Sequence, residues 1–204
     1  MKGKMTFTSF EINEIEAQAD STDMTSLSKV FMQNRFDPST DSAKKIPDEP
    51  GNYILCLKPN AGLPKVPISP SFTDFNGLKV IYTGIAGTSL RKRDFRQHFE
   101  GNNAGKSTLR KSLGVLFGYK QVPRDKNPNS KKTKFGLADE EELTVWMRNH
   151  LIMFFRPKTS IDSIESIEIK LINHFNPPLN IKGNHNSVNA DFRAWLTERR
   201  SDKT

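Results

Sequence analysis

Apolar and polar positions alternate along this chain with two different periods, which predicts a mixed α/β fold. In the N-terminal part, Met24, Leu27 and Phe31 recur at helical spacing, so we expect an amphipathic helix near residues 23–34. Residues 37–50 are rich in proline and polar side chains and are interpreted as a linker.

The rest of the chain contains three apolar runs typical of strands. Residues 53–57 and 78–82 each follow a Pro-Gly or Asn-Gly turn, and residues 151–155 form the most apolar run. Ser89 is expected to cap the first of the remaining helices. These helices are predicted at 90–99, 107–117, 138–150, 163–175 and 190–199. We therefore expect an α/β fold, with a short antiparallel sheet of about three strands flanked by helices.

Composition shifts suggest three parts. We expect a polar, helical N-terminal extension with its linker over 1–46, a central domain over 47–181 and a C-terminal helix over 182–204. Within the central domain, residues 100–134 form a basic insert. No internal repeat is visible in the sequence.

Charge is concentrated in one segment. The net charge is +8, and residues 79–134 carry 14 basic and 3 acidic side chains. The remaining residues are slightly acidic in sum. A concentrated positive field attracts polyanions, and these basic residues alternate with glycines and amides instead of forming a tail. The distribution favours a polyanionic partner over a merely solvated surface.

Several classes of protein are excluded by composition. The chain has 204 residues, 35% hydrophobic, and no stretch approaches the ~20 apolar residues that span a bilayer. We expect no signal peptide, because the N-terminus has no apolar core. The one cysteine, Cys56, excludes an internal disulfide and fits a reducing compartment. We expect a soluble, cytoplasmic protein without membrane partners.

Two short motifs suggest chemistry but fit poorly. Residues 101–107 (GNNAGKS) are similar to a phosphate-binding loop, yet only three residues separate the glycines and a basic helix is predicted before them. A turn that touches a nucleic-acid backbone, or a plain turn between helices, explains them equally well.

Glu168-Ile169-Lys170, with Asp162 before it, is similar to the PD-(D/E)xK nuclease motif, which requires a strand. The apolar positions here instead have helical spacing, and Asp162 with Glu165 is similar to a capping box at the start of a helix.

A third set of residues is spread along the chain. It consists of Gly51-Asn52-Tyr53, Tyr82-Thr83-Gly84, Arg93, Glu168-x2-Leu171-Ile172, and Pro177 followed by Asn180. In type, order and spacing these residues resemble the GIY-YIG nuclease family over roughly residues 50–181. The sequence departs from the family pattern at Asn52 and Thr83, where isoleucines are usual, and in the 28 residues between the two tyrosines. These departures concern subfamily and loop geometry, since no chemical group is lost.

The resemblance implies a metal-dependent DNA endonuclease and assigns roles to particular residues. Glu168 would bind Mg²⁺ (or Mn²⁺), a hard cation that prefers oxygen ligands. Arg93 would clamp the scissile phosphate, Tyr53 would act as general base and Tyr82 would position the reactants.

Two more residues have expected roles in that site. Asn180 would fix a tyrosine or a phosphate. His98 is a catalytic candidate because family members often place a histidine after the arginine. On an α-helix, however, five residues turn by about 140°, which aligns His98 with Arg91 rather than Arg93.

Double-stranded DNA is the expected partner, with a homodimer left open. Lysines and arginines of the basic segment are expected to contact DNA, namely Arg91, Lys92, Arg96, Lys106, Arg110, Lys111, Lys131, Lys132 and Lys134. A restriction-type enzyme is favoured because no separate DNA-reading or repair domain is visible. The alternatives are a repair or mobile-element nuclease, and a non-cleaving nucleic-acid-binding module on the same fold.

Overall fold

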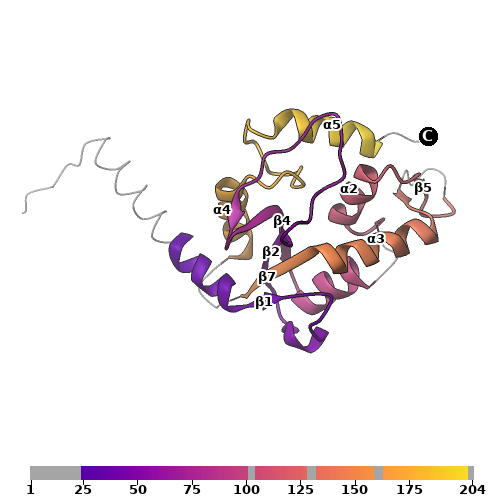
Figure 1. Ribbon diagram of the computed structural model, residues 1–204. Coiled ribbons are helices and arrows are strands. Elements are labelled where there is room, and N and C mark those ends of the chain that lie inside the picture. The colour runs from indigo at the N-terminus through magenta and orange to yellow at the C-terminus, as the bar shows by residue number, and fades with distance from the viewer. Residues whose placement is uncertain (1–23, 101–103, 128–131, 159–162, 202–204) are drawn as a thin grey trace, which may run out of the picture.

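The computed structural model describes residues 24–100, 104–127, 132–158 and 163–201. An antiparallel five-stranded sheet with the order β1-β7-β2-β4-β3 forms its centre (Figure 1). The strands are β1 (Arg35–Phe36), β2 (Gly51–Leu57), β3 (Asp74–Phe75), β4 (Leu78–Ala86) and β7 (Leu151–Pro157). The α/β class is confirmed, but the expectation of about three strands is wrong. Two strands of two residues each extend the three long ones.

Helices occupy the predicted places. Residues 24–33 are helical, and a short 3-10 turn, η1 (Ala43–Lys45), lies within the predicted linker. The other helices are η2 (Arg91–Phe99), α2 (Thr108–Leu116), α3 (Leu137–His150), α4 (Ile164–Phe175) and α5 (Ala190–Ser201). Among the described residues, no helix is long and apolar enough to cross a membrane.

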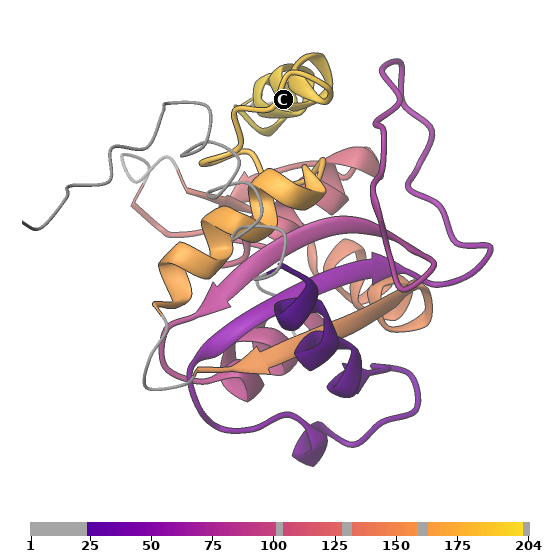
Figure 2. The same ribbon diagram turned by 90° about the vertical axis from the view of Figure 1, so that its left-hand side faces the viewer.

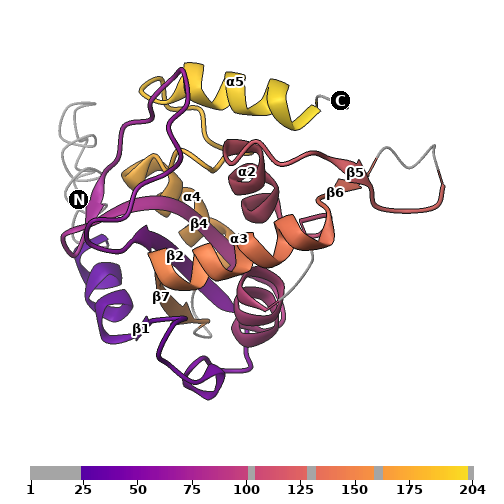
Figure 3. The ribbon, with the colours of Figure 1, turned by 45° about the vertical axis from the view of Figure 1, so that its right-hand side comes forward.

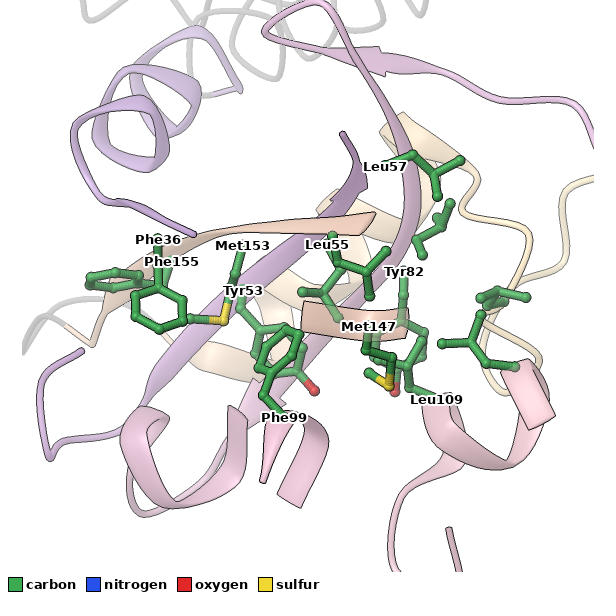
Figure 4. Packing of buried hydrophobic residues seen from close by; sticks show 14 of the residues in the cluster. Phe36, Tyr53, Leu55, Leu57, Tyr82, Phe99, Leu109, Met147, Met153 and Phe155 are labelled. Carbon is green, nitrogen blue, oxygen red and sulfur yellow. The ribbon is translucent and has the colours of Figure 1, made fainter. Parts of the chain in front are cut away.

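The sheet separates two apolar layers because side chains alternate along β2, which is buried throughout. Tyr53 and Leu55 face a cluster that includes side chains of η2, α2, α3 and α5 (Figure 4). Ile54 and Cys56 face a second cluster with α4 and the helix at 24–33. Figure 2 shows the sheet from the side of this second layer.

The helix after β4 differs from the prediction in its type. The Ser89 hydroxyl caps its start as expected, accepting a hydrogen bond from the Lys92 backbone N–H at 3.0 Å. The helix then continues as a π-helix over Arg91–Phe99 instead of an α-helix. Because π-helical bonds join residues five apart, side chains at that spacing lie closer in direction than α-helical geometry implies.

Helix α4 settles the interpretation of the Glu168-Ile169-Lys170 segment. Its N-cap is Ser163, whose hydroxyl accepts from the Ser166 N–H at 3.4 Å, while Asp162 lies outside the described residues. The strand that the PD-(D/E)xK alternative requires is therefore absent from this segment. The helix ends at Asn176, whose φ of 43° is left-handed, directly before two prolines.

The C-terminal part of the basic insert forms a ribbon that leaves the body of the molecule (Figure 3), whereas its helix α2 packs in the core. Strand β5 (Val122–Pro123) pairs with β6 (Thr133–Lys134). The Arg124 guanidinium anchors the base of the ribbon by donating to the Gly105 carbonyl at 2.9 Å. A π-helix rather than a strand precedes the glycine-rich turn, whose residues 101–103 lie outside the described residues, so the turn lacks the context of a phosphate-binding loop.

Candidate active site

The two motif tyrosines lie side by side on the central strands. Tyr53 on β2 and Tyr82 on β4 project from the same face, with ring centroids 6.2 Å apart (Figure 4). Gly84 is the register partner of Tyr53, and a Cβ at this glycine would clash with the Tyr53 hydroxyl. The glycine of the second motif therefore leaves room for the tyrosine of the first.

His98 faces Tyr53 from η2. Its Nε2 lies 3.0 Å from the Tyr53 hydroxyl, and its Nδ1 lies 2.8 Å from the hydroxyl of Ser107. Burial, together with the charges of Arg93 and Arg110, lowers the pKa of His98 to about 3. The imidazole is therefore neutral at physiological pH, with one nitrogen donating and the other accepting.

The alignment of His98 with Arg91 does not occur. The Arg91 guanidinium instead donates to the carbonyl of Ile46 at 2.8 Å, which ties the predicted linker to η2. The π-helical step explains why the α-helical estimate fails. Arg93 donates to Gln97 Oε1 at 2.5 Å, and its charge affects the pKa values of both His98 and Glu168.

Tyr82 and Glu168 line one pocket of about 540 Å³, between β4, α2, α4 and α5. The Tyr82 hydroxyl lies 3.1 Å from the hydroxyl of Thr108, the first residue of α2. Tyr53 is fully buried, whereas Tyr82 is 8% exposed. Tyr82 thus borders the pocket, and the Tyr53–His98 pair lies in the protein interior beside it.

Glu168 is half-buried in the wall of this pocket. Burial and the nearby Glu165 raise the pKa of its carboxyl, while Lys182 and Arg93 act in the opposite direction. In the described part of the chain, no group of three or more His, Cys, Asp or Glu side chains could hold a metal ion. A carboxylate such as that of Glu168 can bind a cation that takes its other ligands from water and substrate, as Mg²⁺ commonly does.

Asn180 holds the strand that carries Tyr82. Its Oδ1 accepts from the Thr83 N–H at 2.9 Å, and its Nδ2 donates to the Thr83 carbonyl at 2.9 Å. These two bonds make Asn180 a brace for β4, and Asn180 also lines the pocket. It satisfies the expectation of fixing a tyrosine only indirectly, through the backbone next to Tyr82.

Asn52, one of the two departures from the family pattern, links the site to α4. Its Nδ2 donates to the Ile164 carbonyl at 2.7 Å, one helical turn before Glu168. The sequence signal for this contact is an asparagine at the start of an apolar strand, because an amide that becomes buried there needs a hydrogen-bond partner. The motif comparison alone missed it.

The prediction that Arg110 contacts DNA is wrong. Its side chain is fully buried and forms an ion pair with Glu140 at 2.7 Å. A charge in a basic segment carries no information on burial, so composition could not reveal this. Of the other predicted DNA contacts, Lys131 lies outside the described residues and Arg91 and Lys111 are half-buried. Those at the surface are Lys92, Arg96, Lys106, Lys132 and Lys134.

Two hydroxyl residues of the site were not predicted. Ser107 and Thr108 contact His98 and Tyr82 respectively. The sequence signal was the glycine-rich turn itself, which ends in a helix cap: the Ser107 hydroxyl accepts from the Arg110 N–H at 3.1 Å. This turn thus contributes to the site by placing hydroxyls against the histidine and the tyrosine.

Comparison with known proteins agrees with this geometry. The family model of the GIY-YIG catalytic domain matches residues 51–202, more than half of the chain. Searches of the curated proteins and of the solved structures found no significant match to this chain. Enzymes of this family are nucleases that hydrolyse nucleic acids and generally depend on a divalent metal. The chain belongs to the GIY-YIG family and is a nuclease.

Proposed function

We propose that this nuclease is a metal-dependent DNA endonuclease of the restriction type. The observation that carries the proposal is the pocket in which Tyr82 and Glu168 converge, with the Tyr53–His98 hydrogen bond beside it. Phosphodiester hydrolysis needs a base for the attacking water and neutralisation of charge on the phosphate. This set of side chains offers both.

Glu168 is the residue that would hold the metal, Mg²⁺ or Mn²⁺. When bound, such an ion supplies a Lewis acid for the phosphate and a site that orients water. The donor chemistry fits, since a half-buried carboxylate with a raised pKa gains from a cation beside it. Arg93, whose charge acts on the same carboxylate, is suited to bind the scissile phosphate through its planar guanidinium.

Tyr53 is the proposed general base, and hydrogen-bond accounting supports the role. The Ser107 hydroxyl accepts from the Arg110 N–H and, in the proposed tautomer, donates its own proton to Nδ1 of His98. The proton of the neutral imidazole then resides on Nε2 and is donated to the Tyr53 hydroxyl oxygen. A donor at this oxygen stabilises the negative charge that a tyrosinate base carries.

Cleavage of plasmid DNA separates this function from its alternatives. We expect nicking with Mg²⁺ or Mn²⁺, none with a chelator, and none from a Glu168→Gln variant that still binds DNA. Binding without cleavage under all metal conditions would favour the non-cleaving module. Discrete fragments from linear DNA support a restriction-type enzyme, whereas cleavage confined to branched or flapped substrates would favour the repair or mobile-element alternative.

The ribbon formed by β5 and β6 is the proposed arm for non-specific DNA contact, because Lys132 and Lys134 are exposed on it. Each lost phosphate contact lowers the salt slope of log K by roughly 0.9. Replacing both lysines with alanine should therefore flatten the slope by up to about 1.8. Lys29→Ala with Lys44→Ala, which changes the net charge equally on distant elements, is the control. An unchanged slope in the arm variant would remove the arm from the interface.

A further inference from the structure

Helices α2 and α5, which both contribute residues to the active-site pocket, carry the same chemical pattern. Each helix presents a hydroxyl, a cation and a second hydroxyl at positions i, i+3 and i+4, which share one helix face. The two sets are Thr108, Lys111 and Ser112 on α2, and Thr197, Arg200 and Ser201 on α5. The helices pack against each other, so the two cations lie in one wall of the pocket.

Arg200 is held in place by α2. Its Nη1 donates to the Ser112 hydroxyl at 3.2 Å, and Ser112 is fully buried. The guanidinium lies close enough to Tyr82 for the two groups to interact electrostatically. This contact extends the active site to a helix that the sequence pattern placed outside the central domain.

Among the described residues, no carboxylate forms an ion pair with either of the two cations. Burial lowers the pKa of Lys111, and the charge of Arg200 lowers it further. Burial lowers the pKa of Arg200 as well. Within the described part of the chain, Glu168 is the one acidic residue that lines the pocket. Partly desolvated like charges are unfavourable unless an anion joins them.

We propose that Lys111 and Arg200 form a second phosphate subsite, which binds a phosphodiester of the DNA strand next to the scissile one. The proposal rests on the proposed DNA substrate and adds a residue, Arg200, that lies outside the five motif elements. A guanidinium fixed by Ser112 and a lysine beside it match the oxygens of a phosphodiester. The subsite fixes the register of the strand while Glu168 and Arg93 act at the bond that breaks.

The first test measures DNA binding without metal, as a function of salt, on a short duplex. Arg200→Gln and Lys111→Gln should each lower the salt slope by about 0.9, and Arg200→Lys should restore it. Arg199→Gln is the matched control, since this neighbouring side chain is exposed and lies on another face of α5. If Arg199→Gln lowers the salt slope as much as Arg200→Gln does, DNA contacts a general basic surface and the subsite is refuted. Melting temperatures confirm that each variant is folded.

The second test identifies the phosphate. Duplexes in which a single phosphate is replaced by a neutral methylphosphonate are bound by the wild type and by Arg200→Gln. At one position near the cleaved bond, the methylphosphonate should weaken binding by the wild type. The same methylphosphonate should hardly weaken binding by Arg200→Gln further, because this variant has already lost the contact with that phosphate. If the methylphosphonate weakens binding by the same factor in the wild type and in Arg200→Gln at every position, the subsite is overturned, even if the enzyme cleaves DNA. Coupling at one position in a protein that never cleaves would refute the proposed function and leave the subsite standing.

Discussion

Replacing Arg110 with methionine should destabilise the fold rather than weaken DNA binding alone. The guanidinium donates to Glu140 Oε2 through Nε at 3.1 Å and through Nη2 at 2.7 Å. It also donates to the carbonyls of Glu140 and His98, each at 2.7 Å. Methionine keeps much of the apolar volume but leaves the Glu140 carboxylate buried without its cation.

The magnitude follows from this burial. Removing one partner of a buried ion pair costs about 3–5 kcal/mol, because an uncompensated charge remains in the interior. For a chain of this size 1 kcal/mol corresponds to roughly 2–4 °C in melting temperature, so we expect a fall of roughly 6–20 °C. Glu140 also accepts from the Ala104 N–H at 3.0 Å, so adding Glu140→Leu should recover only part of the loss.

Thermal melts and DNA titrations of the same variants test this reasoning. Arg96→Met is the control, since this exposed arginine lies in the same basic segment and its loss should change stability by no more than about 0.5 kcal/mol. An Arg110→Met protein that melts like the wild type but binds DNA as weakly as Arg96→Met would refute the structural role of Arg110. It would restore this residue to the DNA interface.

Three further predictions concern the catalytic side chains. Tyr53→Phe should reduce single-turnover cleavage by ~10²–10⁴-fold but stability by only about 1–3 kcal/mol, the cost of removing this partner from the buried His98 Nε2. Tyr82→Phe should lose less activity, and the reverse order would move the base to Tyr82. Because the pKa of Glu168 is raised in the folded state, ionisation of this carboxyl lowers the free energy of unfolding as pH rises through that pKa. Glu168→Gln should remove this loss in thermal melts between pH 4 and 8. An unchanged pH dependence of the melting temperature would contradict the burial argument. The pKa of His98 is lowered from 6.5 to about 3, so the neutral imidazole contributes fully to the free energy of unfolding above pH 6.5. As pH falls from 6.5 toward 3, this contribution decreases by up to about 1.4 kcal/mol per pH unit. His98→Asn should flatten that decline, and a parallel decline in both proteins would assign it to other groups.

Sequence periodicity located the long elements because each buries a continuous stripe or face. The strands with Tyr53 and Tyr82, and the helix with Glu168, are long enough for the period to be visible. Strands β1 and β3 have two residues each, and no period can be read from two residues. Their pairing depends on neighbours far away in the sequence, which explains the wrong strand number.

Motif order indicated the residues of the candidate site, but it could not indicate their contacts. The orientation of His98 depends on a π-helical hydrogen-bond pattern that hydrophobic spacing does not reveal. The burial of Arg110 depends on Glu140 in α3, thirty positions away. Arg200 was missed because its helix reaches the pocket only through packing against α2. Tertiary contacts decide each of these cases, and no local pattern contains them.

The place of β2 between β4 and β7 has a consequence for synthesis of the enzyme. Strand β4 follows β2 closely, but β7 leaves the ribosome only about one hundred residues after β2, so one apolar edge of β2 waits unpaired. An exposed edge of this kind invites aggregation until its partner arrives. Under the proposed role of Glu168 the same delay is protective, because α4 follows β7 and the nascent chain cannot assemble the proposed site before β7 has been made. We expect ribosome-bound fragments that end before β7 to bind chaperones and to leave nucleic acids intact.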